Sequence, residues 1–197
     1  MINENFVILG VIIAFLGGLK YVFETIKGNT KPNKVTWFLW ALAPLIAFAA
    51  ELKQGVGIQS WMTFVVGFTP LLVFLASFIN KQAYWKLTRF DLICGALALL
   101  GLLLWYVTRV SNIAILFSIL ADGLAAVPTI VKSYRYSETE DYFVYLASAI
   151  SAGLTLLTIT TWNFATFGFP IYILTICLIL FTLIKFKIGK LLNKVVA

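Results

Sequence analysis

Residues 6–26 read FVILGVIIAFLGGLKYVFETI, an almost continuous apolar run in which only Lys20 and Glu24 are charged. A helix needs about 20 mostly apolar residues to cross the hydrocarbon core of a membrane. The chain as a whole is also strongly apolar: of its 197 residues, 61% are hydrophobic, 12% are charged and none is His. Soluble domains carry about 25% charged residues. The composition therefore indicates an integral membrane protein and argues against a soluble enzyme or a nucleic-acid-binding domain.

Further apolar runs, separated by charged stretches and by glycines or prolines, predict seven membrane-spanning helices. The predicted spans are Phe6–Ile26, Val35–Lys53, Gln59–Ile79, Phe90–Thr108, Asn112–Lys132, Tyr142–Trp162 and Thr166–Phe186. These runs are too long and too continuous for the alternating strands of a membrane barrel. The predicted fold class is therefore an all-α membrane protein.

The basic residues predict how the chain is oriented. Of the 15 Lys and Arg residues, only Lys20, Lys53 and Arg109 lie outside the linkers that follow the first, third and fifth spans and the tail after the seventh. Cytoplasmic loops carry the excess of Lys and Arg. We therefore expect the amino terminus outside and the carboxyl terminus in the cytoplasm, in a bacterial-type plasma membrane. The net charge of +7 then reflects a lipid bilayer as partner, and we expect no nucleic acid.

Two parts of the chain resemble one another. A shift of 105 residues lays Gly18 on Gly123 and Lys27 on Lys132, and it lays the first three spans on the last three. This shift spans four helices, an even number, so both copies run in the same direction through the membrane. Parallel repeats of this kind occur in transporters.

The repeat predicts the domain organisation. Residues 1–80 would form a first bundle of three helices, and residues 112–197 would form a second bundle followed by a short basic tail. Residues 81–111 would contain a linker helix that has no counterpart in either copy. We call this arrangement 3+1+3.

One segment resembles a known family motif. Residues 122–138 read DGLAAVPTIVKSYRYSE, which is similar to a PQ-loop: a proline, then basic residues, then a serine ahead of the next helix. Thr129 stands where that motif has glutamine. Seven spans, an outward amino terminus and the 3+1+3 arrangement are similar to the SWEET sugar transporters of the PQ-loop superfamily. The resemblance implies alternating-access transport of a small polar solute, with a sugar as the first choice.

The resemblance also implies roles for individual residues. Pro44 and Pro128 match two positions at which SWEET helices have hinge prolines. Trp162 matches an aromatic residue that faces the sugar. Thr69, Thr175 and Cys177 are the polar or small residues nearest to the family's asparagine partners on helices 3 and 7.

Asp122 is the most unusual residue within a span. It lies at the middle of its predicted helix, about 15 Å from either end. A carboxylate at the centre of a bilayer is costly, and such residues usually face a cavity that serves ions, protons or substrate. We therefore expect Asp122 to contact the solute or to couple transport to protons, and Lys20 is a candidate charge partner across the two repeats. A structural carboxyl group bonded to helix backbones is the alternative, as is a Lys20 that reaches the surface or pairs with Glu24.

The sixth span carries several hydroxyl side chains on one face. They recur at three- and four-residue spacing, and they are Ser148, Ser151, Thr155 and Thr158. Trp162 and Asn163 follow at the outer end of this face, which could line a path for a polar solute. Hydroxyl groups also mediate tight packing between membrane helices, so both interpretations stay open.

Other functions remain open on the sequence alone. A proton-coupled amino-acid transporter or a PnuC-type vitamin transporter would have the same topology, and a non-transporting receptor could use the same fold. The acidic residues 138–141 could be a partner contact or a solvated helix start. We expect no enzyme activity, because the spans hold no His and no acidic pair, and the isolated Cys94 and Cys177 have no metal-ligand spacing. No cofactor is expected, and the oligomeric state is open.

Overall fold

The computed structural model describes residues 2–81, 85–108 and 111–196, and these are helical apart from short connections. The eight α-helices are α1 (Phe6–Lys27), α2 (Lys34–Lys53), α3 (Ser60–Ala76), α4 (Arg89–Thr108), α5 (Ser111–Arg135), α6 (Tyr142–Thr158), α7 (Phe164–Lys185) and α8 (Ile188–Val196), with a short 3₁₀ turn η1 (Ser137–Thr139) before α6. Helices α1 to α7 occupy the seven apolar stretches. The prediction of an all-helical chain is confirmed for the described residues.

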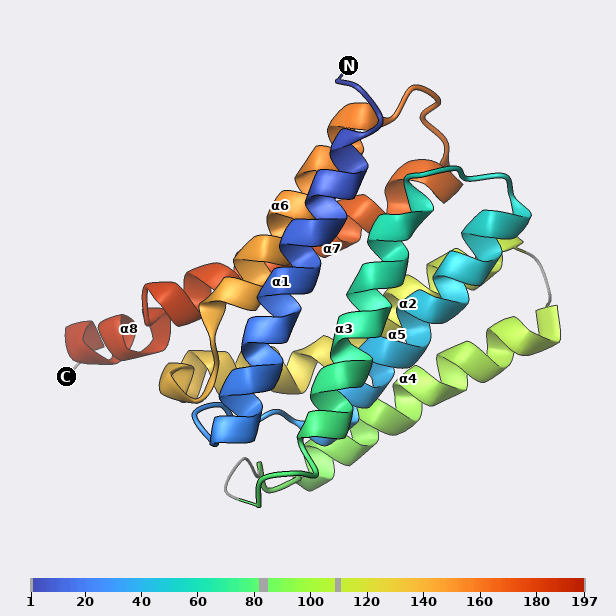
Figure 1. Cartoon of the computed structure of the whole chain (residues 1–197). Helices are drawn as coiled ribbons and strands as arrows, with labels where there is room; N and C mark the ends of the chain where they lie inside the picture. The colour runs from blue at the N-terminus through green and yellow to red at the C-terminus, as the bar shows by residue number, and fades with distance from the viewer. Residues whose placement is uncertain (1, 82–84, 109–110, 197) are drawn as a thin grey trace.

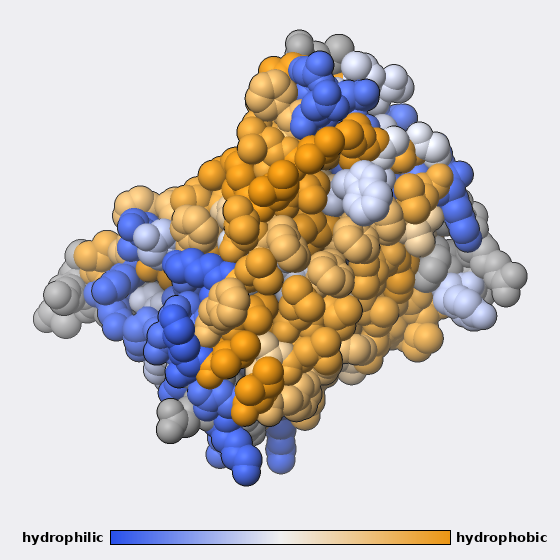
Figure 2. All heavy atoms as spheres, in the orientation of Figure 1, coloured by the Kyte–Doolittle hydropathy of each residue, from blue (hydrophilic) through white to orange (hydrophobic). Residues whose placement is uncertain are grey.

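Within the described residues, four helices are long and apolar enough to cross a membrane: α1, α2, α5 and α7. Helices α3 and α6 are also apolar but have only 17 residues each. Figure 2 shows a broad hydrophobic band over the helices, with hydrophilic residues gathered at the two ends of the molecule. These features indicate an integral membrane protein.

Helix α1 shows why the band forms. Its residues Ile8, Ile12 and Leu16, one turn apart, are about half exposed. The opposite face is buried against other helices and is rich in small residues, namely Gly10, Ala14, Gly17 and Gly18. Soluble monomers rarely expose contiguous apolar surface on this scale, so lipid is the solvent that suits this face.

Side-chain caps and a glycine set several helix ends. Asn33 caps α2 by accepting hydrogen bonds from the backbone N–H groups of Val35 and Thr36. Gly28 ends α1 with a φ of 85°, a left-handed conformation that glycine adopts without steric cost. Helix α6 ends at Thr158, four residues earlier than predicted.

The helices form two groups with matching contacts (Figure 1). In the first group, α3 packs against both α1 and α2; in the second, α7 packs against both α5 and α6. The groups meet where α1 packs against α6 and α2 packs against α5. Exchanging α1, α2 and α3 for α5, α6 and α7 therefore maps every one of these contacts onto another. Helix α4 packs against α5 and, less extensively, α2.

The basic tail contains a helix that the sequence analysis did not predict. Helix α8 projects sideways from the end of α7 (Figure 1), and it packs against α5 and α7. Lys190 of α8 pairs with Glu138 at 2.8 Å. That hydrogen bond lowers the pKa of Glu138 below its ordinary value. The tail thus contacts the segment between α5 and α6 through this surface ion pair.

Candidate functional site

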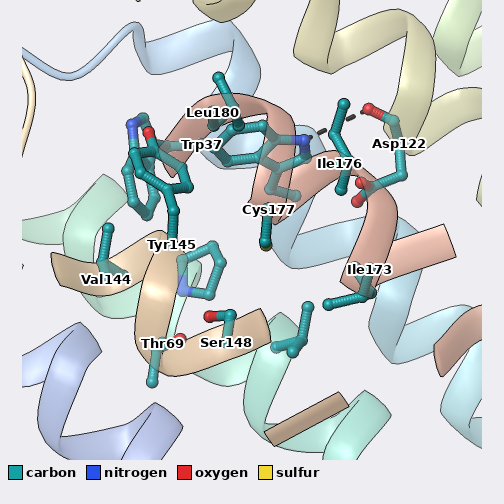
Figure 3. Close-up of a pocket in the computed structure, with 13 residues that line it drawn as sticks. Trp37, Thr69, Asp122, Val144, Tyr145, Ser148, Ile173, Ile176, Cys177 and Leu180 are labelled. Carbon is teal, nitrogen blue, oxygen red and sulfur yellow. Dashed lines mark hydrogen bonds between the residues drawn. The ribbon is translucent and has the colours of Figure 1, made fainter. Parts of the chain in front are cut away.

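A small cavity lies at the centre of the protein, where the two groups of helices meet (Figure 3). Helices α2, α3, α5, α6 and α7 contribute its walls. The lining residues are Trp37, Trp40, Val66, Thr69, Pro70, Asp122, Val144, Tyr145, Ser148, Ile173, Ile176, Cys177 and Leu180. The cavity has a volume of about 40 Å³, whereas ligand pockets usually measure about 300–1,000 Å³. It holds a few water molecules at most, so a larger solute requires the helices to separate.

Asp122 is the only formally charged residue among the described residues on the wall of this cavity. Its side chain is buried, and the hydroxyl group of Tyr172 donates a hydrogen bond to its Oδ2 atom at 2.6 Å. Its Oδ1 atom has no hydrogen-bond partner among the described residues. The indole N–H of Trp40 donates to the backbone oxygen of Asp122 at 3.2 Å, which ties α2 to α5 at this depth. One carboxylate oxygen is therefore left for a ligand, a proton or water.

Three aromatic side chains form another part of the wall. The rings of Trp37 and Trp40 are 5.4 Å apart between centroids and nearly perpendicular, and those of Trp40 and Tyr145 are 6.2 Å apart in the same edge-to-face arrangement. Edge-to-face contacts of this kind add stability beyond area burial. Trp37 is completely buried, and its indole N–H has no partner within the described part of the chain.

A cluster of buried polar side chains lies beside the cavity, on the side where α5 ends and α6 begins. We call it the polar plug, and it consists of Tyr21, Lys132, Glu140 and Tyr145. Lys132 Nζ contacts Glu140 Oε1 at 2.6 Å, and the hydroxyl groups of Tyr21 and Tyr145 donate to Glu140 Oε2 at 2.6 and 3.0 Å. Both charged side chains are essentially inaccessible to solvent. Three hydrogen bonds and an opposite charge thus compensate the buried carboxylate.

The polar plug connects the two groups of helices. Tyr21 belongs to α1, whereas Lys132, Glu140 and Tyr145 belong to α5, α6 and the segment between them. Lys132 Nζ also donates to the backbone oxygen of Lys31, in the connection between α1 and α2. Because Tyr145 also lines the cavity, the plug separates the cavity from this end of the protein.

Two expectations about these charges were wrong. The sequence places Lys132 with the basic residues of a cytoplasmic linker, and Glu140 in a partner contact or a solvated helix start, but each side chain is buried against the other. Pairing removes the main cost of burying either charge alone. A position near a helix end therefore did not imply contact with water.

Four of the predicted pathway residues do line the cavity. They are Asp122, Thr69, Ser148 and Cys177, and they come from four different helices. The thiol of Cys177 is free. The structure thus brings together residues that are up to 108 positions apart in the chain.

The other hydroxyl residues of α6 do not face the cavity. Ser151 lies against α1, where a Cβ atom added to Gly10 would come within 3.1 Å of it. Thr155 and Thr158 donate their hydroxyl hydrogens to the backbone of α6 itself, at Ser151 and Thr155. The predicted path along this face is therefore wrong beyond Ser148, and the face packs against a neighbouring helix.

Three further predicted residues lie away from the cavity. Trp162 is 58% exposed and follows the end of α6, with its ring 5.8 Å from that of Phe167. Asn163 caps α7 through the backbone N–H of Thr166. Thr175 is exposed and donates to the backbone of its own helix. Trp162 and Asn163 lie outside the site because α6 ends before them. Thr175 lies outside it because its side chain points outward from α7.

The candidate charge partner of Asp122 pairs elsewhere. Lys20 Nζ lies 2.6 Å from Asp141, at the start of α6, and 4.8 Å from the centroid of the Phe143 ring. The candidate pair between Lys20 and Asp122 is therefore wrong, whereas the alternative of a partly exposed Lys20 side chain agrees with the structure. The long side chain of Lys20 extends from α1 to the start of α6 and not toward the central cavity.

The two candidate hinge prolines are both inside helices. Pro44 lies in α2 and Pro128 in α5, and both are buried. Neither lines the central cavity. A proline inside a helix removes one backbone hydrogen bond and favours a kink. Their role as hinges stays a prediction.

Comparisons with known proteins do not identify a relative of this chain. No family model, no curated protein and no solved structure matches it. The resemblance to the PQ-loop superfamily therefore stays a prediction. Among the described residues, no three His, Cys, Asp or Glu side chains are grouped as a metal site would require.

Proposed function

We propose that this protein carries a small polar solute across a membrane by alternating access. In this proposal, α1 to α7 all span the bilayer, with the amino terminus outside and the tail in the cytoplasm. Helices α1–α3 and α5–α7 form two parallel bundles, joined by α4, which rock about the central cavity. The family resemblance makes a sugar the first solute to test.

The central cavity is the observation that carries this proposal. It lies between two groups of helices whose contacts map onto one another, as two repeats around a transport site would. It contains a buried carboxylate with an unpartnered oxygen atom. Intramembrane carboxylates of this kind usually mark a substrate or ion pathway.

Closures on both sides of the cavity also support alternating access. The polar plug closes one side. At the other end of α2 and α5, a separate apolar cluster packs between α2, α5 and α7; it contains Ala50, Val56, Ala114, Ile115 and Ala165. Opening one closure while the other holds would expose the cavity to one side of the membrane at a time.

Transport by purified protein tests this function. We expect reconstituted vesicles to take up a labelled sugar or amino acid, with or without a pH gradient. Replacing Asp122 by Asn should lower the flux about tenfold or more, since a hydrogen bond to a charged group is worth about 1.5–3 kcal/mol. Asp141→Asn is the matched control, because Asp141 pairs with Lys20 outside the cavity. Absence of flux for every solute would refute the carrier and favour a receptor, and equal fluxes in both variants would remove Asp122 from the pathway.

Reporter fusions test the proposed orientation and number of spans. Alkaline phosphatase needs disulfides and is active only in an oxidising compartment. We expect fusions after Gln54 and after Thr160 to be active, and fusions after Lys81 and at the carboxyl terminus to be inactive. The reverse pattern would invert the orientation, and activity at the Lys81 fusion together with the Gln54 fusion would contradict the predicted third span.

A further inference from the structure

The charge balance of the central cavity is incomplete. Asp122 is its only formally charged residue, and the described salt bridges leave it without a partner: Lys20 is bound to Asp141 and Lys132 to Glu140. The hydroxyl group of Tyr172 satisfies Oδ2, but Oδ1 has no partner among the described residues. A buried carboxylate in this situation requires a positive charge or a proton.

The wall around this carboxylate is suited to a cation. Trp37, Trp40 and Tyr145 present three aromatic rings in mutual contact, and the bond from the Trp40 indole to the Asp122 backbone fixes one ring beside the carboxylate (Figure 3). The faces of aromatic rings attract cations, and tryptophan does so most strongly. Recognition of ammonium groups commonly uses such rings.

Charge, more than size, distinguishes solute classes at this cavity. At about 40 Å³ it holds a few water molecules at most, so a sugar and an organic cation would both require the helices to separate. A sugar is neutral, so it would leave the Asp122 carboxylate without a counter-charge.

We propose that the solute is a small organic cation, whose ammonium group binds Asp122 Oδ1 beside the rings of Trp37, Trp40 and Tyr145. This inference rests on the proposed carrier function and replaces the sugar with a different solute class. Its uncharged portion lies toward the apolar wall formed by Ile173 and Ile176.

Binding of matched ligands tests this inference separately from transport. The probes are choline and 3,3-dimethyl-1-butanol, which have the same shape but differ in charge, together with tetramethylammonium and glucose. The full-length protein in lipid nanodiscs is titrated while its tryptophan fluorescence and its melting temperature are recorded. We expect choline to bind at least about tenfold more tightly than the neutral analogue. The Asp122→Asn variant should lose this difference, and Asp141→Asn should retain it.

The outcomes separate the two proposals. Choline binding without flux of choline or of any other solute in vesicles would support the cation site and refute the carrier. Flux of glucose that choline does not inhibit would support a carrier and overturn the cation site. Equal affinity for choline and its neutral analogue, or no response to either cation, would also overturn it. If Asp122→Asn is poorly folded, Trp40→Phe provides the second variant, with weaker choline binding expected because phenylalanine is a poorer cation partner.

Discussion

Replacing Glu140 by Gln is expected to lower the free energy of unfolding by about 3–5 kcal/mol, the usual cost of removing one partner from a buried ion pair. The substitution keeps the size of the side chain but leaves the ammonium group of Lys132 buried without a counter-charge. It also weakens the hydrogen bonds that Tyr21 and Tyr145 donate to the carboxylate. Unfolding of the purified protein by denaturant in detergent measures the loss.

A matched control is provided by a second ion pair. Glu138 pairs with Lys190, but both side chains are about half exposed. Exposed pairs contribute about 0–1 kcal/mol, so Glu138→Gln should have little effect. The double variant Lys132→Met, Glu140→Gln should lose less stability than Glu140→Gln alone, because no uncompensated charge remains. Similar losses for Glu138→Gln and Glu140→Gln would show that the polar plug does not hold a buried ion pair.

The same substitution should also change access to the cavity. The polar plug joins Tyr21 of α1 to residues of α5 and α6, so weakening it should favour separation of the two groups at that end. Cys177 lines the cavity and reports this opening. In a Cys94→Ala background, a maleimide added to vesicles should label Cys177 faster in Glu140→Gln than in the parent protein. Unchanged labelling would assign the plug a purely structural role.

Replacing Gly17 by Ala is expected to destabilise the protein, although the same change usually stabilises a helix by about 1 kcal/mol. A Cβ atom on Gly17 would lie 2.5 Å from the Cβ atom of Ala147, which is too close without movement of α1 away from α6. Overpacking of this kind typically costs about 1–3 kcal/mol. Because α1 and α6 join the two groups of helices, the variant should also loosen the contact between them.

Gly153→Ala is the control for this prediction. Gly153 lies in α6 and is partly buried, and a Cβ atom added there would meet nothing within 4 Å. Its substitution should be neutral or slightly stabilising. Melting temperatures of the two variants in the same detergent measure the contrast. A Gly17→Ala variant as stable as Gly153→Ala would mean that α1 and α6 are farther apart than the structure places them.

Asp122 was found from the sequence because a lone carboxylate is conspicuous in an apolar run. Tyr172, which donates to it, was not found, because a tyrosine in an apolar helix is unremarkable and lies 50 positions away. Glu140 and Lys132 were misjudged for a related reason. Both lie near helix ends, where charged residues usually contact water, and contacts with residues distant in the sequence, such as Tyr21 and Lys31, help to enclose them.

The hydroxyl residues of α6 illustrate the limit of periodicity. Their three- and four-residue spacing correctly indicates a shared face, but spacing cannot tell whether that face meets a cavity or another helix. Ser148 meets the cavity, whereas Ser151 meets α1. The partner of Lys20 was ambiguous for the same reason, because its side chain could reach several carboxylates. In the structure, the relative placement of α1 and α6 brings it next to Asp141.

Local chemistry along the chain was enough to establish where the helices lie and that lipid suits their outer surface, since both depend on the apolar content of short segments. Which side chains meet depends on contacts between helices that are distant in the sequence. These contacts are set by close packing at small residues such as Gly17 and by buried hydrogen bonds such as the one that Tyr21 donates to Glu140. For that reason the cavity, its aromatic wall and the polar plug became evident only in the tertiary structure.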